Sequence, residues 1–258
     1  MVLFFISIGL NDEKDMSIKA IGIARSCDKL FAELYTSKLN TNELKLEEFI
    51  GKDIIVLSRQ DLEENFQKIL DEAKDKKVGL LVGGDAFIST THSSLMLEAK
   101  KQNIEVKVIH GSSIISAVCE SGFHIQKFGQ TITIPFLERT KGRLPLSIYK
   151  TILENKKRGL HTLCLLDIIS EENRFMSVNE ALNVLLNLEN KVRKKVISRS
   201  TELVVFSRLG DDSQSIVYGN IEELINLSFG EPPHTIVLVG NLHFSERECL
   251  KYFRVKID

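Results

Sequence analysis

Continuous apolar segments alternate with segments of helical periodicity through the first half of the sequence, and this alternation limits the chain to a few folds. Segments such as 78–84 are apolar on both faces, which is typical of strands in a parallel sheet that helices cover on both sides. Between them, Ser17 is a good helix N-cap, and apolar residues over 61–74 recur with the period of an amphipathic helix. The expected strands are 2–8, 29–35, 53–57, 78–84 and 106–111, with helices after Ser17 and at 44–50, 61–74 and 90–102.

The second half of the sequence alternates less regularly. Gly210, Asp211 and Asp212 separate two strand-like segments, which predicts a hairpin and therefore antiparallel pairing. The expected strands are 130–136, 160–169, 202–210, 215–219 and 234–240, and the expected helices are 113–121, 148–157 and 178–189. We therefore predict two α/β domains, with a parallel sheet in residues 1–112 and a mixed sheet in residues 113–258.

Acidic and basic residues almost balance, since 34 Lys and Arg against 35 Asp and Glu give a formal net charge of −1. A protein that binds nucleic acid through its phosphates needs a basic surplus, so we expect no direct nucleic-acid partner. The basic segment 191–199 is interpreted as a solvated helix end, with steering of an acidic partner as the alternative.

The cysteines and the apolar opening both indicate a soluble protein. Cys27, Cys119, Cys164 and Cys249 lack the spacing of a metal site or a disulfide framework, so we interpret them as reduced core thiols of a cytoplasmic protein. The apolar segment 1–10 is too short to span a bilayer and lacks the basic start of a signal peptide. We expect it to form a buried first strand, with no membrane contact.

Three glycine-containing segments lie where predicted strands end. Ligands of open parallel sheets bind beyond the carboxyl ends of the strands, so these segments are candidates for ligand contact. In the first, Gly9 would allow a close backbone approach to a ligand, although an ordinary strand-to-helix turn explains it as well. In the second, Gly83 and Gly84 precede Asp85, a carboxylate suited to ribose hydroxyls or an ammonium group, with a simple turn as the alternative. In the third, 110–113, the serines either cap a helix or face the same ligand.

Catalytic and metal-binding patterns are missing from the sequence. No phosphate-binding glycine motif or catalytic triad is recognisable, and no two of the six histidines have metal-ligand spacing, so we expect no metal. His234 follows two prolines at the start of a predicted strand, a stiff setting that suits a ligand contact.

Several segments together resemble the diphthine synthase family. The most specific are Gly-Leu-His-Thr-Leu-Cys-Leu-Leu-Asp at 159–167 and Arg-Phe-Met-Ser-Val-Asn-Glu-Ala at 174–181. Further matching segments, 12–15, 33–37, 90–92, 128–131 and 233–234, follow the family's order along the whole chain.

The resemblance implies a tetrapyrrole-methylase-like fold of two α/β domains, a homodimer, and S-adenosyl-L-methionine held in the cleft between the domains. It also implies methyl transfer in diphthamide biosynthesis, onto the 3-amino-3-carboxypropyl group of a histidine of elongation factor 2. In the family, eukaryotic members trimethylate the amine and esterify a carboxylate, whereas archaeal members stop at the trimethylated amine. The cofactor contacts carried over by position are Leu10, Asp85, Ile88, Ser113, Ile114, Leu166, Phe206 and His234.

The loop after Gly84 departs from the family pattern. Where relatives usually have Gly-Asp-Pro-Phe-Gly, this chain has Ala86 in place of the proline and Ile88 in place of the last glycine. Bulk at Ile88 would narrow an adenosine pocket and weaken cofactor binding. The altered loop keeps one alternative open, a catalytically weak or inactive scaffold that binds elongation factor 2. A second alternative is another methylase of the same fold: the near-zero net charge disfavours a ribosomal-RNA methylase, and the segments 159–167 and 174–181 disfavour a tetrapyrrole methylase.

Overall fold

The computed structural model describes residues 1–256, and the chain divides into two compact units, Met1–Ile115 and Ser116–Asp258. The boundary expected from the sequence, after residue 112, lies three residues before the observed one at 115. Because each unit carries its own sheet and core, the two are described separately.

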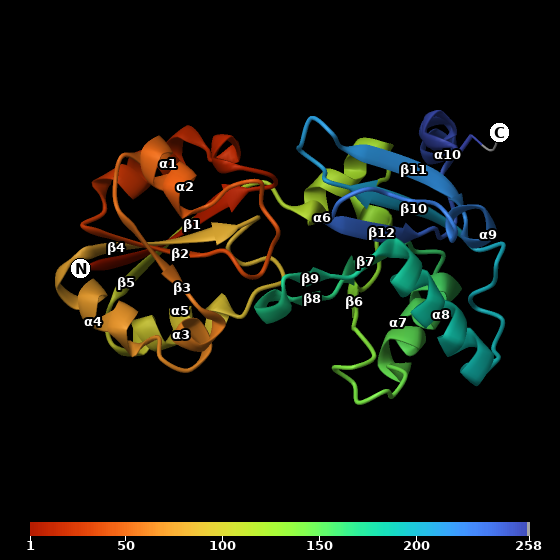
Figure 1. The fold of residues 1–258 in the computed structure, drawn as a ribbon, viewed down its shortest axis with the longest axis horizontal. Helices are drawn as coiled ribbons and strands as arrows, with labels where there is room; N and C mark the ends of the chain where they lie inside the picture. The colour runs from red at the N-terminus through yellow and green to blue at the C-terminus, as the bar shows by residue number, and fades with distance from the viewer. Residues whose placement is uncertain (257–258) are drawn as a thin grey trace. The chain divides into compact units, whose positions relative to one another are not determined.

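The first unit is built on a five-stranded sheet in which every neighbouring pair is parallel, as predicted. The strand order is β3-β2-β4-β1-β5 (Figure 1). The strands are β1 (Val2–Gly9), β2 (Lys29–Glu33), β3 (Ile54–Leu57), β4 (Lys77–Gly83) and β5 (Glu105–Ile109).

Helices cover both faces of this sheet. Figure 1 shows α1 (Ile18–Ser26) and α2 (Glu43–Ile50) on one face, and their apolar residues form one core cluster with the strands. On the other face, α3 (Arg59–Glu63), α4 (Gln67–Asp75) and α5 (His92–Lys101) form a second cluster. Ser17 caps α1 as predicted, since its hydroxyl accepts the Ala20 N–H at 3.1 Å. The short helix η1 (Glu13–Asp15) follows β1.

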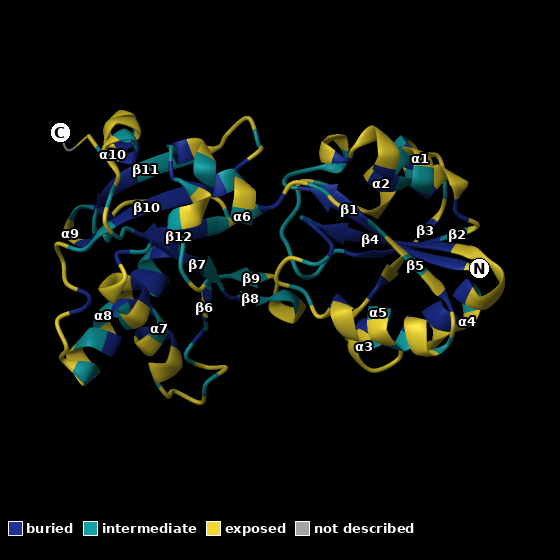
Figure 2. Cartoon of the chain, turned by 180° about the vertical axis from the view of Figure 1, so that it is seen from behind, coloured by how far each residue is buried: buried dark blue, intermediate teal, exposed yellow. Residues whose placement is uncertain are grey.

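Two details of the first unit differ from the sequence prediction. The single helix predicted over 61–74 is two helices, because the Asn65 N–H turns back to the Gln60 carbonyl and α4 starts afresh after Phe66. The edge strand β3 is not buried on both faces, since the side chains of Ile55 and Val56 are 43% and 41% exposed. Only strands with neighbours on both sides have the continuous burial expected from their sequence (Figure 2).

The second unit is built on a mixed five-stranded sheet of order β11-β10-β12-β7-β6. Its β6–β7 pair is parallel, whereas the other pairs are antiparallel, including the β10–β11 hairpin that the sequence predicted. The strands are β6 (Ile132–Ile134), β7 (Thr162–Leu166), β10 (Glu202–Ser207), β11 (Ser215–Asn220) and β12 (His234–Leu238). A separate two-stranded ribbon pairs β8 (Ile168–Ile169) with β9 (Arg174–Phe175).

The helices α7 (Leu146–Lys157) and α8 (Val178–Val192) pack on one face of this sheet and supply much of its core. A capping box between Ser177 and Glu180 starts α8. The shorter helices are α6 (Ile114–Ala117), α9 (Ile221–Leu224), α10 (Phe244–Leu250), η2 (Val118–Ser121), η3 (Ile125–Lys127), η4 (Ser170–Glu172) and η5 (Lys251–Phe253).

The four cysteines are free thiols, but the prediction that all lie in the core is wrong for two of them. Cys27 and Cys164 are buried, whereas Cys119 is half-buried and Cys249 is exposed on α10. A helical period places every third or fourth residue on one face, so a helical cysteine next to apolar residues can still face water.

No helix within residues 1–256 is long and apolar enough to cross a membrane.

Candidate functional site

The three glycine-containing segments follow β4, β1 and β5, which are neighbours in the first sheet. Their parallel strands place these segments together at one edge. The connection that leaves β1 leads toward β2 on one side, whereas the connection that leaves β4 leads to β5 on the other side. The connections that leave β1 and β4 therefore lead to opposite sides of the sheet, which makes this pair of strands a topological switch point. Open α/β sheets bind ligands at such a point.

Backbone hydrogen bonds join the first two segments. The Gly9 N–H donates to the Gly84 carbonyl at 3.2 Å, and the Gly84 N–H donates to the Gly9 carbonyl at 2.7 Å. Next to them, the buried hydroxyl of Ser7 accepts the Ala86 N–H at 3.0 Å. The loop after β4 is therefore anchored to the end of β1.

The glycines at this edge have different reasons for lacking a side chain. A Cβ on Gly9 would lie 2.4 Å from the Cβ of Asp15, whose carboxylate accepts the N–H groups of Leu10 and Asn11 at 3.1 and 2.6 Å. A Cβ on Gly111 would lie 2.7 Å from the Cβ of Ser7. Contacts within the protein are therefore enough to explain both glycines, which agrees with the ordinary-turn alternative for Gly9.

Gly84 differs from Gly9 and Gly111, because open space surrounds the position of its absent Cβ. It has a φ of +67°, and apart from Gly84 and its two chain neighbours no heavy atom lies within 4 Å of an ideal Cβ there. The positive φ explains the glycine. The open space also leaves room for a ligand to approach the backbone of this loop.

The carboxylate of Asp85 joins the loop after β4 to the loop after β5. It accepts the Phe87 N–H at 3.0 Å and the Gly111 N–H at 3.2 Å, and it lies 2.8 Å from Nδ1 of His110. The sequence suggested that this carboxylate contacts a ligand, but the structure uses it first to hold two loops together. Because a carboxylate has about four acceptor positions, it keeps capacity for a further donor.

The other predicted contacts of the first unit lie in the same loops. Ile88 is 38% exposed at the end of a turn closed by its N–H and the Asp85 carbonyl, 3.1 Å apart. Leu10 is half-buried just after β1. The hydroxyl of Ser113 accepts the Ile115 N–H at 3.3 Å, so the capping role considered from the sequence is present, and Ile114 begins α6.

In the second unit, the predicted contacts Leu166, Phe206 and His234 lie at one end of the mixed sheet. His234 pairs with Ser207, and Phe206 pairs with Thr235 across the β10–β12 ladder. Thr235 pairs with Leu165, so Leu166 is the next residue along β7, beside His234. The fold thereby gathers residues that are 68 positions apart in the sequence.

Two buried polar atoms at this end of the sheet lack a hydrogen-bond partner among the described residues: Nδ1 of His234 and Oγ of Ser207. Nε2 of His234 lies 3.4 Å from the Phe229 carbonyl. Burial lowers the pKa of His234 more than this carbonyl raises it, so the ring is neutral at pH 7. If Nε2 carries the proton toward Phe229, Nδ1 offers a lone pair to a donor, such as a ligand hydroxyl or amine.

Arg208 fixes the loop that precedes His234. Its guanidinium donates to the Phe229 carbonyl at 3.0 Å and also to the Glu231 carbonyl, while its Nε donates to the Ser213 hydroxyl at 2.9 Å. These bonds tie the 208–214 turn to the 229–233 loop. The loop that leads into His234, the first residue of β12, is therefore fixed by hydrogen bonds from Arg208.

Each set, taken by itself, offers an acceptor to a ligand that carries hydroxyl or amine donors: the Asp85 carboxylate in the first unit and Nδ1 of His234 in the second. They supply no basic side chain for a phosphate. Within residues 1–256, no group of three or more His, Cys, Asp or Glu side chains is placed to hold a metal ion.

Sequence similarity to known proteins identifies the family of this chain. Residues 2–225 match the family model of tetrapyrrole (corrin/porphyrin) methylases. A diphthine synthase from Methanocaldococcus jannaschii is 47% identical over 254 residues, which cover 97% of this chain and 98% of that protein. The chain belongs to the diphthine synthase family. It is a methyltransferase.

Solved structures of diphthine synthases have the same fold. One crystal structure of a diphthine synthase superposes with a TM-score of 0.89 at 34% identity, covering 98% of this chain and 96% of the other. A protein from Entamoeba histolytica that has been proposed to be a diphthine synthase superposes with a TM-score of 0.90 at 36% identity, with 99% of each chain covered. The resemblance, the α/β fold and the methyltransferase assignment made from the sequence are confirmed.

The departures from the diphthine synthase pattern have different structural consequences. Ala86 is fully buried, and its carbonyl accepts bonds from Thr90 Oγ1 at 2.8 Å and Nδ1 of His92 at 2.9 Å. These bonds hold the loop where the family has a rigid proline. Ile88 instead faces outward, so its bulk is available to a ligand at this edge of the sheet.

Sequence reasoning missed two residues of the site. It placed His110 in a candidate segment without recognising it as the partner of Asp85. It also overlooked Ser207, although a polar residue at the end of the apolar strand 202–207 was a usable signal. The role of the predicted residues as cofactor contacts stays a prediction.

Proposed function

We propose that this protein transfers methyl groups from S-adenosyl-L-methionine to a modified histidine of elongation factor 2, in diphthamide biosynthesis. The acceptor is the 3-amino-3-carboxypropyl group, whose amine is trimethylated and whose carboxylate is then esterified. Full-length similarity to a diphthine synthase at 47% identity is the observation that carries this proposal. We further propose that the protein acts in the cytoplasm as a homodimer.

The proposed cofactor contacts come from both sets of residues described above. Open space beside Gly84 and the further acceptor capacity of Asp85 suit the adenosine part of S-adenosyl-L-methionine. The unpaired Nδ1 of His234, in the second unit, suits a hydroxyl or amine donor. When bound, this cofactor supplies an electrophilic methyl group on a sulfonium.

The chemistry explains why no catalytic triad is needed. Methyl transfer requires the attacking atom and the methyl carbon to be in line at about 3 Å, so positioning supplies most of the acceleration. The attacking amine must be neutral, and a carboxylate that becomes an ester must be ionised. Neither requirement calls for a strong base, which agrees with a site whose polar groups serve mainly to hold loops and ligand.

Mass spectrometry of elongation factor 2 tests the proposal. The substrate carries the unmethylated intermediate and is incubated with this protein and S-adenosyl-L-methionine. We expect a gain of three methyl groups on the amine, and of a fourth where the carboxylate is also esterified, about 14 Da each for replacement of H by CH₃. A gain of three, with ester hydrolysis during work-up excluded, would restrict the activity to the amine. No gain, together with no cofactor binding by calorimetry, would favour the scaffold alternative.

A His234→Ala variant tests whether the proposed contacts serve the reaction. We expect weaker binding of S-adenosyl-L-methionine by about tenfold, the effect of losing one hydrogen bond of about 1.4 kcal/mol. Wild-type affinity in this variant would remove His234 from the site without contradicting the methyltransferase assignment.

A further inference from the structure

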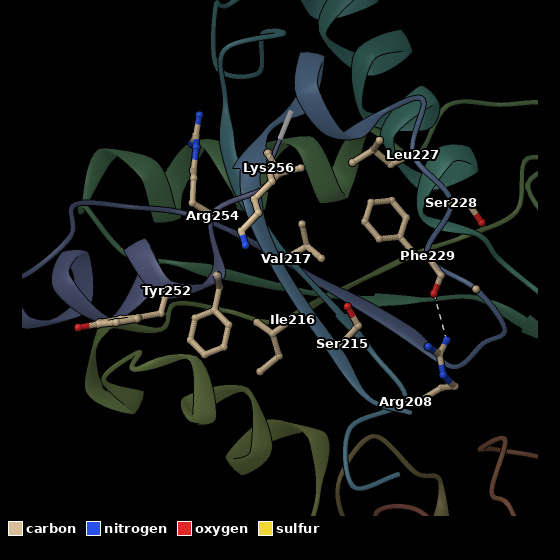
Figure 3. A pocket seen from close by; sticks show the side chains of 13 residues that line it. Arg208, Ser215, Ile216, Val217, Leu227, Ser228, Phe229, Tyr252, Arg254 and Lys256 are labelled. Carbon is tan, nitrogen blue, oxygen red and sulfur yellow. Dashed lines mark hydrogen bonds between the residues drawn. The ribbon is translucent and has the colours of Figure 1, made fainter. Parts of the chain in front are cut away.

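A groove of about 490 Å³ runs along the outer edge of β11 in the second unit. Figure 3 shows side chains from the hairpin turn, the 227–230 loop and the C-terminal segment converging on it. We call it the β11 groove, and its lining comprises Arg208, 215–217, 227–230 and 252–256. None of these residues belongs to the predicted cofactor contacts.

The backbone of β11 is open toward this groove. β11 is the outermost strand of its sheet, and the Tyr218 carbonyl accepts the Val255 N–H at 2.8 Å, so the polar groups of Tyr218 point outward. In an antiparallel strand, alternate residues point their N–H and C=O groups to the same side, so those of Ile216 also point outward. The C-terminal segment cannot pair with Ile216, because it is helical at η5 (Lys251–Phe253). No backbone hydrogen bond within residues 1–256 uses these outward groups of Ile216.

The side chains around this open strand edge are apolar and basic. Apolar groups come from Val217, Phe229 and Leu227, of which Leu227 is 37% exposed. The charged lining residues are all cations, namely Arg208, Arg254 and Lys256. No acidic residue is among the lining residues of the groove.

The three cations differ in their availability. Arg254 pairs with Glu223, and the guanidinium of Arg208 donates to the neutral carbonyl oxygens of Phe229 and Glu231. Lys256 is exposed, and Figure 3 shows its side chain extending over the groove toward Val217. Charge complementarity therefore favours an anionic occupant, and Lys256 is the cation best placed to meet it.

We propose that the β11 groove binds an extended segment of the protein substrate that carries acidic side chains. The segment adds a strand to β11 through the outward N–H and C=O of Ile216, places apolar side chains against Phe229 and Val217, and sets a carboxylate near Lys256. An extended peptide is favoured over a nucleic-acid strand because only a peptide satisfies an open strand edge. This proposal rests on the proposed function, since it names where that protein substrate docks.

Two variants remove the two recognition elements separately. Ile216→Pro removes the outward N–H at a position where an edge strand tolerates proline, and Lys256→Glu reverses the exposed charge. Lys251→Glu is the matched control, because Lys251 is an exposed lysine of the same segment that does not line the groove. Thermal unfolding checks that all three variants fold.

Methylation rates are measured against the concentration of elongation factor 2 that carries the unmethylated intermediate. We expect Ile216→Pro and Lys256→Glu each to raise the KM for elongation factor 2 at least tenfold. In both variants kcat and the affinity for S-adenosyl-L-methionine should stay within twofold of wild type. Lys251→Glu should match wild type. The KM of wild type should rise more steeply with salt than that of Lys256→Glu, because salt screens the attraction that the variant lacks.

The same variants are tested for binding of elongation factor 2 by interferometry, which separates the two proposals. If the wild-type protein binds elongation factor 2 but transfers no methyl group to it, the proposed function is overturned and the groove proposal is not. Equal binding and equal KM in wild type, Ile216→Pro and Lys256→Glu would overturn the groove proposal alone. Displacement of elongation factor 2 by a single-stranded RNA oligonucleotide, or loss of dimers in Ile216→Pro by size-exclusion chromatography, would also overturn it.

Discussion

The carboxylate of Asp85 lies 2.8 Å from Nδ1 of His110 and so joins the loops that follow two strands separated by β1 in the sheet. Burial alone would raise the pKa of Asp85, but hydrogen bonds from the Phe87 N–H, His110 and the Gly111 N–H outweigh it and lower the pKa. The ionised carboxylate is therefore part of the folded site at neutral pH. Because this pKa is depressed, the stabilisation is complete above the unfolded pKa of 3.8 and is lost as the pH falls below it.

Asp85→Asn should weaken cofactor binding and lower stability together. The amide cannot accept all the bonds of the carboxylate, and a hydrogen bond to a charged group is worth about 1.5–3 kcal/mol. We expect S-adenosyl-L-methionine affinity to fall at least tenfold by calorimetry, whereas the exposed control Asp75→Asn should bind like wild type. Unchanged affinity in Asp85→Asn would show that holding the two loops together does not matter for binding.

Ala86→Pro restores the proline of the family pattern but should destabilise this protein. Proline removes the N–H that Ser7 Oγ accepts at 3.0 Å, and Ser7 is 1% exposed, so its hydroxyl would lose that donor inside the protein. We expect a loss of about 1–3 kcal/mol in the free energy of unfolding, measured in urea. The double variant Ser7→Gly/Ala86→Pro should recover part of that loss, and a gain of stability in Ala86→Pro alone would refute this account.

Ile88→Gly should leave cofactor affinity equal to wild type or improve it. The side chain is 38% exposed and contributes little to the core, whereas its bulk lies in the loop proposed to face adenosine. Calorimetric titration of S-adenosyl-L-methionine measures the effect. A large loss of affinity would mean that Ile88 contributes an apolar contact to the cofactor.

Gly9→Ala and Gly22→Ala should have opposite effects on stability. Gly9 has a φ of +110°, and an added Cβ would lie 2.4 Å from the Cβ of Asp15, so we expect a loss above about 1 kcal/mol. Gly22 lies within α1 with nothing within 4 Å of an added Cβ, so alanine there should stabilise by about 0.5–1 kcal/mol. Urea unfolding of both variants checks the pair, and similar effects would contradict the observed backbone at Gly9.

Loss of the Glu33 proton should lower the free energy of unfolding as the pH rises. Burial raises its pKa to about 7 from 4.5, although hydrogen bonds from Thr36 act in the other direction. Between these values the folded protein holds a proton that the unfolded chain has lost, so the free energy of unfolding decreases with pH, by at most about 3 kcal/mol.

Glu33→Gln should remove this part of the pH dependence, because the amide does not titrate but still accepts a bond from Thr36. Urea unfolding at pH 5 and pH 8 compares wild type with Glu33→Gln and with the exposed control Glu64→Gln. We expect the variant to be at least as stable as wild type at pH 8. A pH dependence as steep as that of wild type would show that Glu33 is ionised in the folded protein.

Local features of the fold could be predicted from the sequence because their causes are local. Ser17 starts α1 through a bond three residues along the chain, and the turn at Gly210 sets the β10–β11 hairpin. The break between α3 and α4 was missed, since apolar periodicity continues through Asn65 while the backbone hydrogen bonds do not.

The sequence by itself determined the strand-helix alternation, and with it a parallel sheet with glycine loops along one edge. Only the tertiary structure decided what each loop residue contacts, because strand order sets the distances between residues far apart in the chain. The order β4-β1-β5 places His110 against Asp85, and the β10–β12 ladder places Ser207 opposite His234. Gly9 and Gly84 look alike in the sequence, yet Asp15 fills the space beside one and the space beside the other is open.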